Sequence, residues 1–178
     1  MEELVRAGFI KGVLDITTTE LADELAGGVL SAGPDRLEAA GAAGIPQVVS
    51  VGALDMVNFG ARDTVPARYS GRLFYEHNAL VTLMRTTPEE NAALGATIAE
   101  KLSRATGPTV LMIPERGVSG IDVAGKPFHD PAADSALFTA LRGGVGPNVE
   151  VVTFDTDIND PAFATAAAER LIELMRQR

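Results

Sequence analysis

The sequence predicts an α/β fold, a three-layer Rossmann-like domain built around a mostly parallel β-sheet. Short apolar runs alternate along the chain with longer segments of helical period. Most of these runs lack polar residues at alternate positions, which indicates strands that are buried on both faces of a sheet. Glycine and proline separate the segments and form no low-complexity tract. We therefore expect residues 1–178 to form a single domain.

The predicted strands are apolar runs that are too short for most helices. They span residues 8–16, 47–51, 79–84, 109–113 and 149–154. The helical segments between them predict right-handed crossover connections, which place neighbouring strands parallel.

The predicted helices begin at recognisable caps. Residues 87–90, TPEE, combine an N-cap threonine, a proline at the first helical position and a glutamate that closes a capping box. This motif predicts a helix over 88–104. Asp130 and Asp160 each precede a proline and predict two further helices.

Two segments are less regular. A helix beginning near residue 20 has either Thr17 or Thr19 as its N-cap, and a short helix follows from Pro34. Residues 53–71 show little periodicity. A connection of this length inside a compact domain is typically functional, an interface or mobile.

Composition excludes several classes of protein. The formal net charge is −9, which argues against non-specific binding of nucleic acid or of anionic membranes. There are no cysteines, so disulfides, thiolate catalysis and cysteine-ligated metal sites are excluded. The acidic N-terminus is not a signal peptide, and no apolar run approaches the ~20 residues of a membrane span. We expect a cytoplasmic protein.

Polar side chains follow several of the predicted strands. Arg85 and Thr86 lead into the helix that begins at residue 88, and helix N-termini favour anions because of their unpaired N–H groups. Thr17, Arg116 and Ser119 stand at other strand ends. Because ligands of parallel sheets bind beyond the carboxyl ends of the strands, we expect these groups to face one anion-binding pocket.

Other motifs leave alternatives open. Residues 117–120, GVSG, form either an anion-binding nest or a plain loop. His77 is either a catalytic base, oriented by Asp15 or Glu76, or a structural histidine. The oxygen-rich segment 155–160 has ligands that suit Mg²⁺, but capping and turn roles explain it better, and we predict no metal site there. The glycine-rich signatures of dinucleotide and Walker-type sites are absent, as is the nucleophile elbow.

Several long motifs resemble one family. The runs LDITTTELADEL, HNALVTLMRTTPEE and PERGVSGIDVAGKPFHDPAADSALFTAL are similar to the C-terminal half of the Tm-one-like ATP-binding family, an uncharacterised protein family (UPF). Its plant members include the tomato mosaic virus resistance protein. The resemblance implies a Rossmann-like domain preceded by a second such domain, with ATP and Mg²⁺ in a cleft between the two. The nucleotide-binding signature of the family belongs to the N-terminal half, which is not in this sequence.

The resemblance also implies a set of pocket residues. Two of them are His77 and Asp15, and if the domain is an enzyme, we expect His77 to transfer the proton with Asp15 or Glu76 nearby. As ligand-binding residues the resemblance implies Thr17, Thr18, Asn58, Asn78, Arg85, Thr86, Arg116, Ser119 and Asp157.

Two functions of different classes follow. In the first, the domain binds an anionic metabolite or nucleotide, alone or as one wall of a cleft shared with an N-terminal domain. In the second, the domain is an assembly module, and residues 53–71 form a homodimer surface.

Overall fold

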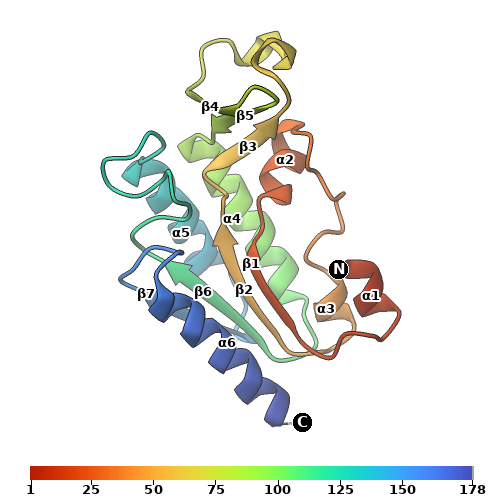
Figure 1. Cartoon of the computed structure of the whole chain (residues 1–178). Helices are drawn as coiled ribbons and strands as arrows, with labels where there is room; N and C mark the ends of the chain where they lie inside the picture. Colours follow the sequence, from red (N-terminus) through yellow and green to blue (C-terminus); the bar gives the residue numbers. More distant parts are fainter. Residues whose placement is uncertain (178) are drawn as a thin grey trace.

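The computed structural model describes residues 1–177, and its centre is a four-stranded parallel sheet. The strands lie in the order β1 (Val13–Thr17), β2 (Gln47–Gly52), β6 (Thr109–Pro114) and β7 (Val149–Phe154). Four of the predicted strands are thereby confirmed. Because the order follows the chain, the sheet grows in one direction from β1 to β7 (Figure 1).

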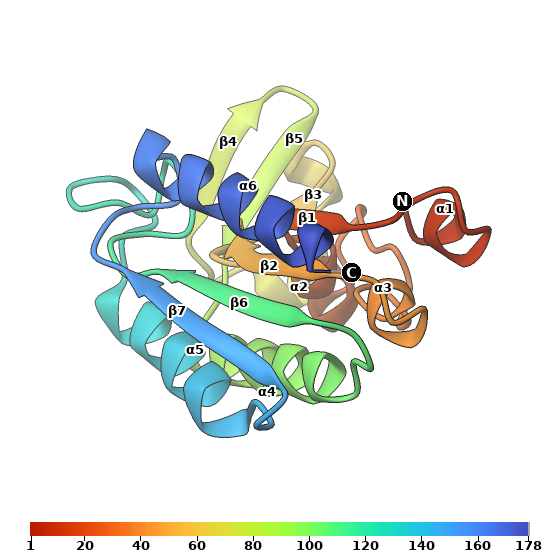
Figure 2. The ribbon, with the colours of Figure 1, turned by 90° about the horizontal axis from the view of Figure 1, so that it is seen from below.

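Helices cover both faces of this sheet and make three layers, as predicted. Figure 2 shows α4 (Pro88–Ser103) and α5 (Pro131–Gly144) on one face and α6 (Pro161–Arg176) on the other. Helix α2 (Glu20–Ala26) packs beside α4 through the larger apolar cluster. The predicted cap motif of α4 forms as a complete capping box, in which the Glu90 N–H donates to Thr87 Oγ1 over 3.2 Å.

The core has two main parts. The larger one lies between the sheet and α2, α4 and α5, and includes Leu111, Ile98 and Leu137, all less than 1% exposed. The smaller one lies under α6, where Phe163 and Ala167 contact the opposite face of the same strands. No helix within residues 1–177 is long and apolar enough to cross a membrane.

The N-terminal region differs from the prediction. A short helix, α1 (Glu2–Arg6), comes first, and Gly8 turns the chain with a φ of 76°. The first strand therefore begins at Val13 rather than at residue 8. A second short helix, α3 (Ala39–Ala42), packs beside α1 near the start of this strand (Figure 1).

The run 79–84 does not join the parallel sheet. It forms β5 (Val81–Arg85) of a separate antiparallel sheet, between β3 (Met56–Phe59) and β4 (Phe74–Asn78). Only residues 79 and 80 separate β4 from β5, and so short a connection permits only an antiparallel hairpin. The segment 53–71 supplies β3 and two short 3₁₀ turns, so it is more regular than its sequence indicates.

Candidate functional site

The carboxyl ends of the four parallel strands meet at one edge of the sheet, and two clefts open there. The smaller has a volume of about 190 Å³ and is lined by Thr17, Gly52, Ser119 and Asn159, among others. Ala53, also in its lining, has a φ of 58°, a conformation that is strained for a residue with a side chain. The sequence prediction that Thr17 and Ser119 come together is therefore met.

The larger cleft has a volume of about 670 Å³ and lies between the loops after β6 and β7 and helix α5. Arg116 and Asp157 reach it from the loops, and His129 and Arg142 from the α5 side. Arg116 pairs with Asp155, and both side chains are more than 65% exposed. Arg142 pairs with Glu115 at about 40% exposure. Exposed pairs of this kind contribute about 0–1 kcal/mol, so both guanidinium groups can turn to a ligand at little cost.

Arg85 does not line either cleft. Its guanidinium is buried and donates from Nη2 to Asp122 over 3.0 Å and to Asp134 over 2.8 Å. Its Nε donates to the Phe128 carbonyl over 2.7 Å, and its Nη1 to Thr86 Oγ1 over 3.1 Å. The expectation that Arg85 and Arg116 face one hollow is wrong, because the first is held in a structural network and only the second reaches the cleft.

The network around Arg85 contains more carboxyl groups than cationic groups. Asp55, Asp122 and Asp134 are all buried near this single guanidinium. Burial raises the pKa of Asp122 to about 8 and that of Asp55 to about 6. Burial also raises the pKa of Asp134. Titratable groups shifted in this way beside a cleft are typical of functional sites, although structural networks produce the same shifts.

Asp55 connects this network to the smaller cleft. Its Oδ2 accepts a hydrogen bond from the Ser119 hydroxyl over 2.7 Å, while its buried Oδ1 has no partner within the described residues. A buried carboxylate oxygen without a donor is uncommon and costly. Ser119 also lines the smaller cleft, so its hydroxyl links Asp55 to that cleft.

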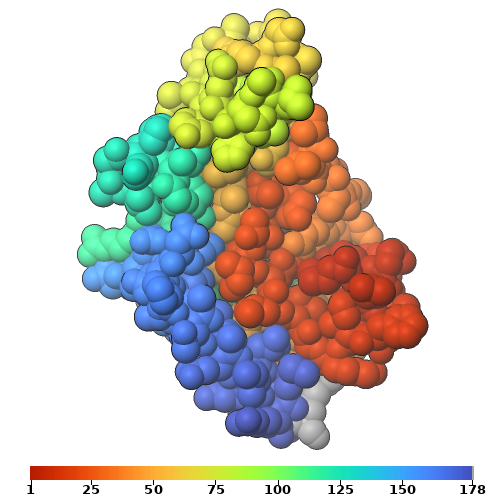
Figure 3. Space-filling view, in the orientation of Figure 1, coloured from red at the N-terminus to blue at the C-terminus, as the bar shows by residue number. Residues whose placement is uncertain are grey.

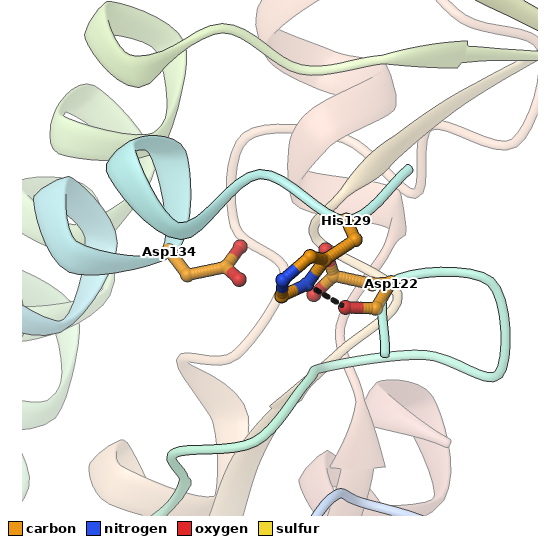
Figure 4. Close-up of side chains that lie close together, drawn as sticks. All are labelled: Asp122, His129 and Asp134. Atoms are coloured by element: carbon orange, nitrogen blue, oxygen red, sulfur yellow. Dashed lines mark hydrogen bonds between the residues drawn. The ribbon is translucent and has the colours of Figure 1, made fainter. Parts of the chain in front are cut away.

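Asp122, His129 and Asp134 have the donor atoms of a metal site. Figure 4 shows the three side chains close together, and one ligand atom from each lies within 4.8 Å of the others. However, both carboxylates already accept from Arg85, and His129 Nδ1 lies 3.2 Å from the Asp122 carbonyl oxygen. The cation of this cluster is therefore the guanidinium of Arg85.

Several residues implied as pocket residues have structural partners. Asp15 accepts two bonds from Arg36, over 2.5 and 2.7 Å, in a buried pair. The Asn58 side chain donates to Asp23 over 3.1 Å and thereby joins β3 to α2. Thr18 is fully buried, with its hydroxyl bonded to the Ser50 carbonyl.

The remaining implied residues are Thr86, Asp157, His77 and Asn78. Thr86 Oγ1 donates to the Leu54 carbonyl over 2.8 Å, so it links β5 to the loop after β2. Asp157 lines the larger cleft, and its side chain also accepts from the Asn159 N–H over 2.8 Å, as expected for a turn. His77 and Asn78 are exposed at the end of β4, away from Asp15, which is enclosed by Arg36.

Sequence reasoning missed five residues of this region: Asp55, Asp122, His129, Asp134 and Arg142. The signal available for Asp55 was its place directly after a buried strand. Asp134 and Arg142 lie on one helix, eight residues apart, and only the folded position of α5 brings them to the strand ends.

Fold and site together define a Rossmann-like α/β domain with clefts at the carboxyl ends of its parallel strands. Residues 1–175 match the model of the Uncharacterised protein family (UPF0261) C-terminal domain, and the chain belongs to this family.

The chain is 55% identical over 178 residues to a UPF0261 protein of Clostridium tetani, which covers 99% of this chain and 44% of that protein. It is 56% identical over 169 residues to a UPF0261 protein of Rhizobium meliloti, covering 94% of this chain and 42% of the relative. It is also 47% identical over 176 residues to the ToMV resistance protein Tm-1(GCR237) of Solanum lycopersicum, covering 98% of this chain and 23% of that protein. The chain thus spans less than half the length of these curated relatives.

Proposed function

We propose that this domain binds an anionic small molecule in the larger cleft and forms one wall of a site that a preceding domain completes. One observation carries the proposal. Arg116, Arg142 and His129 line a single cleft, and both guanidinium groups form exposed ion pairs, with Arg142 also 5.9 Å from the Phe138 ring centroid. A planar guanidinium suits carboxylate and phosphate groups because it can donate two parallel hydrogen bonds.

A nucleotide is the anion that we favour. The volume of about 670 Å³ falls in the range of small-molecule sites. The relatives are more than twice as long as this chain, and the rest of such a protein would supply the second wall. More specifically, we propose that the nucleotide is ATP, with Mg²⁺ bound to its phosphates.

The test is calorimetry with ATP, AMP and inorganic phosphate, each with and without Mg²⁺. We expect the double variant Arg116→Ala/Arg142→Ala to bind at least ~10-fold more weakly, since each charged contact contributes about 1.5–3 kcal/mol. Arg104→Ala is the matched control, because the Arg104 side chain is 66% exposed in an ion pair, as Arg116 is at 67%, but lies outside this cleft. Equal affinity of the double variant and the wild type would remove the larger cleft from the proposal.

The second candidate is an assembly module without a ligand of its own. Several large apolar side chains are exposed, including Leu73 at 52% and Leu80 at 75%. The segment 53–71 adds little to this, because Val65 and Tyr69 pack against the core. Light scattering decides between the two: a homodimer at micromolar concentration favours assembly, and a monodisperse monomer contradicts it.

A further inference from the structure

One face of the parallel sheet is only partly covered. Three helices pack on one side of it, but α6 alone covers the other (Figure 2). Helix α6 packs across β1 and β2, and its Phe163 and Leu174 belong to one apolar cluster with Val48 and Val110. On the edge strand β1, Leu14 remains 38% exposed. An apolar side chain in the middle of a strand is normally covered by a neighbouring element.

Helix α6 adds apolar side chains beside this strand. Ile172 is 47% exposed and Met175 is 43% exposed, three residues apart on the helix. Met175 lies directly against β1, because a Cβ at Gly12 would come 2.8 Å from its Sδ. Gly12 directly precedes β1, so Met175 lies at the start of the strand that carries Leu14. Phe9, 79% exposed, precedes them. We call Phe9, Leu14, Ile172 and Met175 the uncovered face.

The β4–β5 hairpin rises on the same side of the sheet as α6 (Figure 2). Leu80 at its turn is 75% exposed, and His77 and Asn78 beside it are exposed too. In the space-filling view, the surface of β1 lies between α6 and the N-terminal helix, below the hairpin (Figure 3). The hairpin and α6 therefore flank the surface of β1.

We propose that the uncovered face and the hairpin turn are the docking surface for the domain that precedes this one in its relatives. The matched region occupies 44% of the Clostridium tetani protein and 42% of the Rhizobium meliloti protein, so more than half of each remains, enough for a second domain of similar size. The family model identifies the matched region as the C-terminal domain. Helix α1, which begins at residue 2, packs beside the start of β1 (Figure 1), so the preceding chain of a relative enters near this edge of the sheet.

Apolar contact is the chemistry of this interface. The exposed side chains are isoleucine, methionine, leucine and phenylalanine, of the kind enriched at the centre of interfaces. The inference rests on the part of the proposed function in which a second domain precedes this one, and not on its ligand or on the larger cleft, which is lined by α5 and the loops after β6 and β7. Docking at the hairpin turn brings the exposed His77 and Asn78 toward the preceding domain.

The experiment uses single-cysteine labelling, for which this chain is suited because it contains no cysteine. Leu80→Cys, Ile172→Cys and Met175→Cys are made in this chain, and cysteines are placed at the aligned positions of the full-length Clostridium tetani protein. Leu25→Cys on α2 is the matched control, 48% exposed against 47% for Ile172. Maleimide labelling rates are measured at each site by peptide mass spectrometry.

We expect labelling to be at least ~10-fold slower in the full-length protein at the three test positions and unchanged at the control. Equal rates at the test positions in both proteins overturn the proposal. Slow labelling at these positions already in the isolated chain, with a doubled mass by light scattering, also overturns it, because a second copy is then the occupant. Calorimetry with ATP has no bearing on these rates, so failure of docking and failure of the proposed ligand are distinguishable.

Discussion

Arg85 is the residue on which the interior of this end of the molecule depends. It comes from β5, and its partners Asp122 and Asp134 come from the loop after β6 and from α5. One side chain thus ties the antiparallel sheet to the rest of the domain. Buried ion pairs of this kind add little net stability compared with apolar residues, but removal of one partner leaves the other charges uncompensated.

Arg85→Ala should therefore lower the free energy of unfolding by about 3–5 kcal/mol, the cost of breaking a buried pair. Urea denaturation followed by circular dichroism measures the loss. Arg104→Ala, which removes an exposed pair, should change it by less than ~1 kcal/mol. A loss below ~1 kcal/mol in Arg85→Ala would show that the aspartates are neutral without their partner.

Asp55 should make the protein less stable as the pH rises. Burial raises its pKa from 3.8 to about 6, so the folded state binds this proton more tightly than the unfolded chain. The stability that the proton contributes is complete below the unfolded pKa of about 4 and is lost as the pH rises through about 6.

Asp55→Asn should flatten this part of the pH dependence. The measurement is the free energy of unfolding between pH 4.5 and 7.5, where one proton changes it by up to ~1.4 kcal/mol per pH unit. Asp63→Asn, an exposed substitution, is the control and should keep the wild-type slope. Parallel curves for wild type and Asp55→Asn would mean that Asp55 titrates normally.

At the scale of elements, α4 and α5 pack closely because Gly95 has no side chain. A Cβ at this position would lie 2.7 Å from the Leu137 carbonyl oxygen and 2.7 Å from the Ala140 Cβ. Gly95→Ala should therefore destabilise the domain by about 1–3 kcal/mol through overpacking. Gly143→Ala is the matched control on α5: nothing lies within 4 Å of its Cβ, so alanine should stabilise by about 0.4–1 kcal/mol. Thermal melts measure the melting temperature of both variants, which should fall for Gly95→Ala and rise for Gly143→Ala. A change in the same direction for both would contradict this prediction.

Element prediction from the sequence succeeded where local chemistry decides the outcome. The capping box at Thr87 forms as its residues indicate, and Asp130 and Asp160 accept from the first N–H groups of α5 and α6. It failed for β5, because burial of an apolar run does not reveal its partner. Val81–Arg85 is buried between β3 and β4, and the pairing direction depends on a two-residue turn that contains no glycine.

The whole molecule combines a rigid parallel sheet with a smaller antiparallel one. We expect amide hydrogen exchange to be slowest in β2 and β6, which are central in the sheet and fully buried. Exchange should be fastest at the β4–β5 turn, whose residues are exposed. Mass spectrometry of exchanged peptides checks this order, and a β4–β5 turn as slow as β6 would contradict it.

The site was partly predictable, because the carboxyl ends of parallel strands lie at the same edge of a sheet. The rule that parallel strands end together correctly brought Thr17 to Ser119 and Arg116 to Asp157. The rule gave the wrong result for Arg85, because its strand belongs to the other sheet. The acidic network was not predictable, since Asp55, Asp122 and Asp134 come from three separate segments whose approach depends on tertiary packing.

The hydrogen bond between Ser119 and Asp55 has one more consequence. Asp134 lines the larger cleft and shares Arg85 with Asp122, while Asp55 reaches the smaller cleft through Ser119. The two clefts are therefore linked by buried acids, and the negative charge of each acid raises the pKa of its neighbours. A molecule that binds in one cleft and displaces a proton from these acids must shift the pKa values of the acids beside the other cleft. By thermodynamic reciprocity, this coupling is equal in both directions.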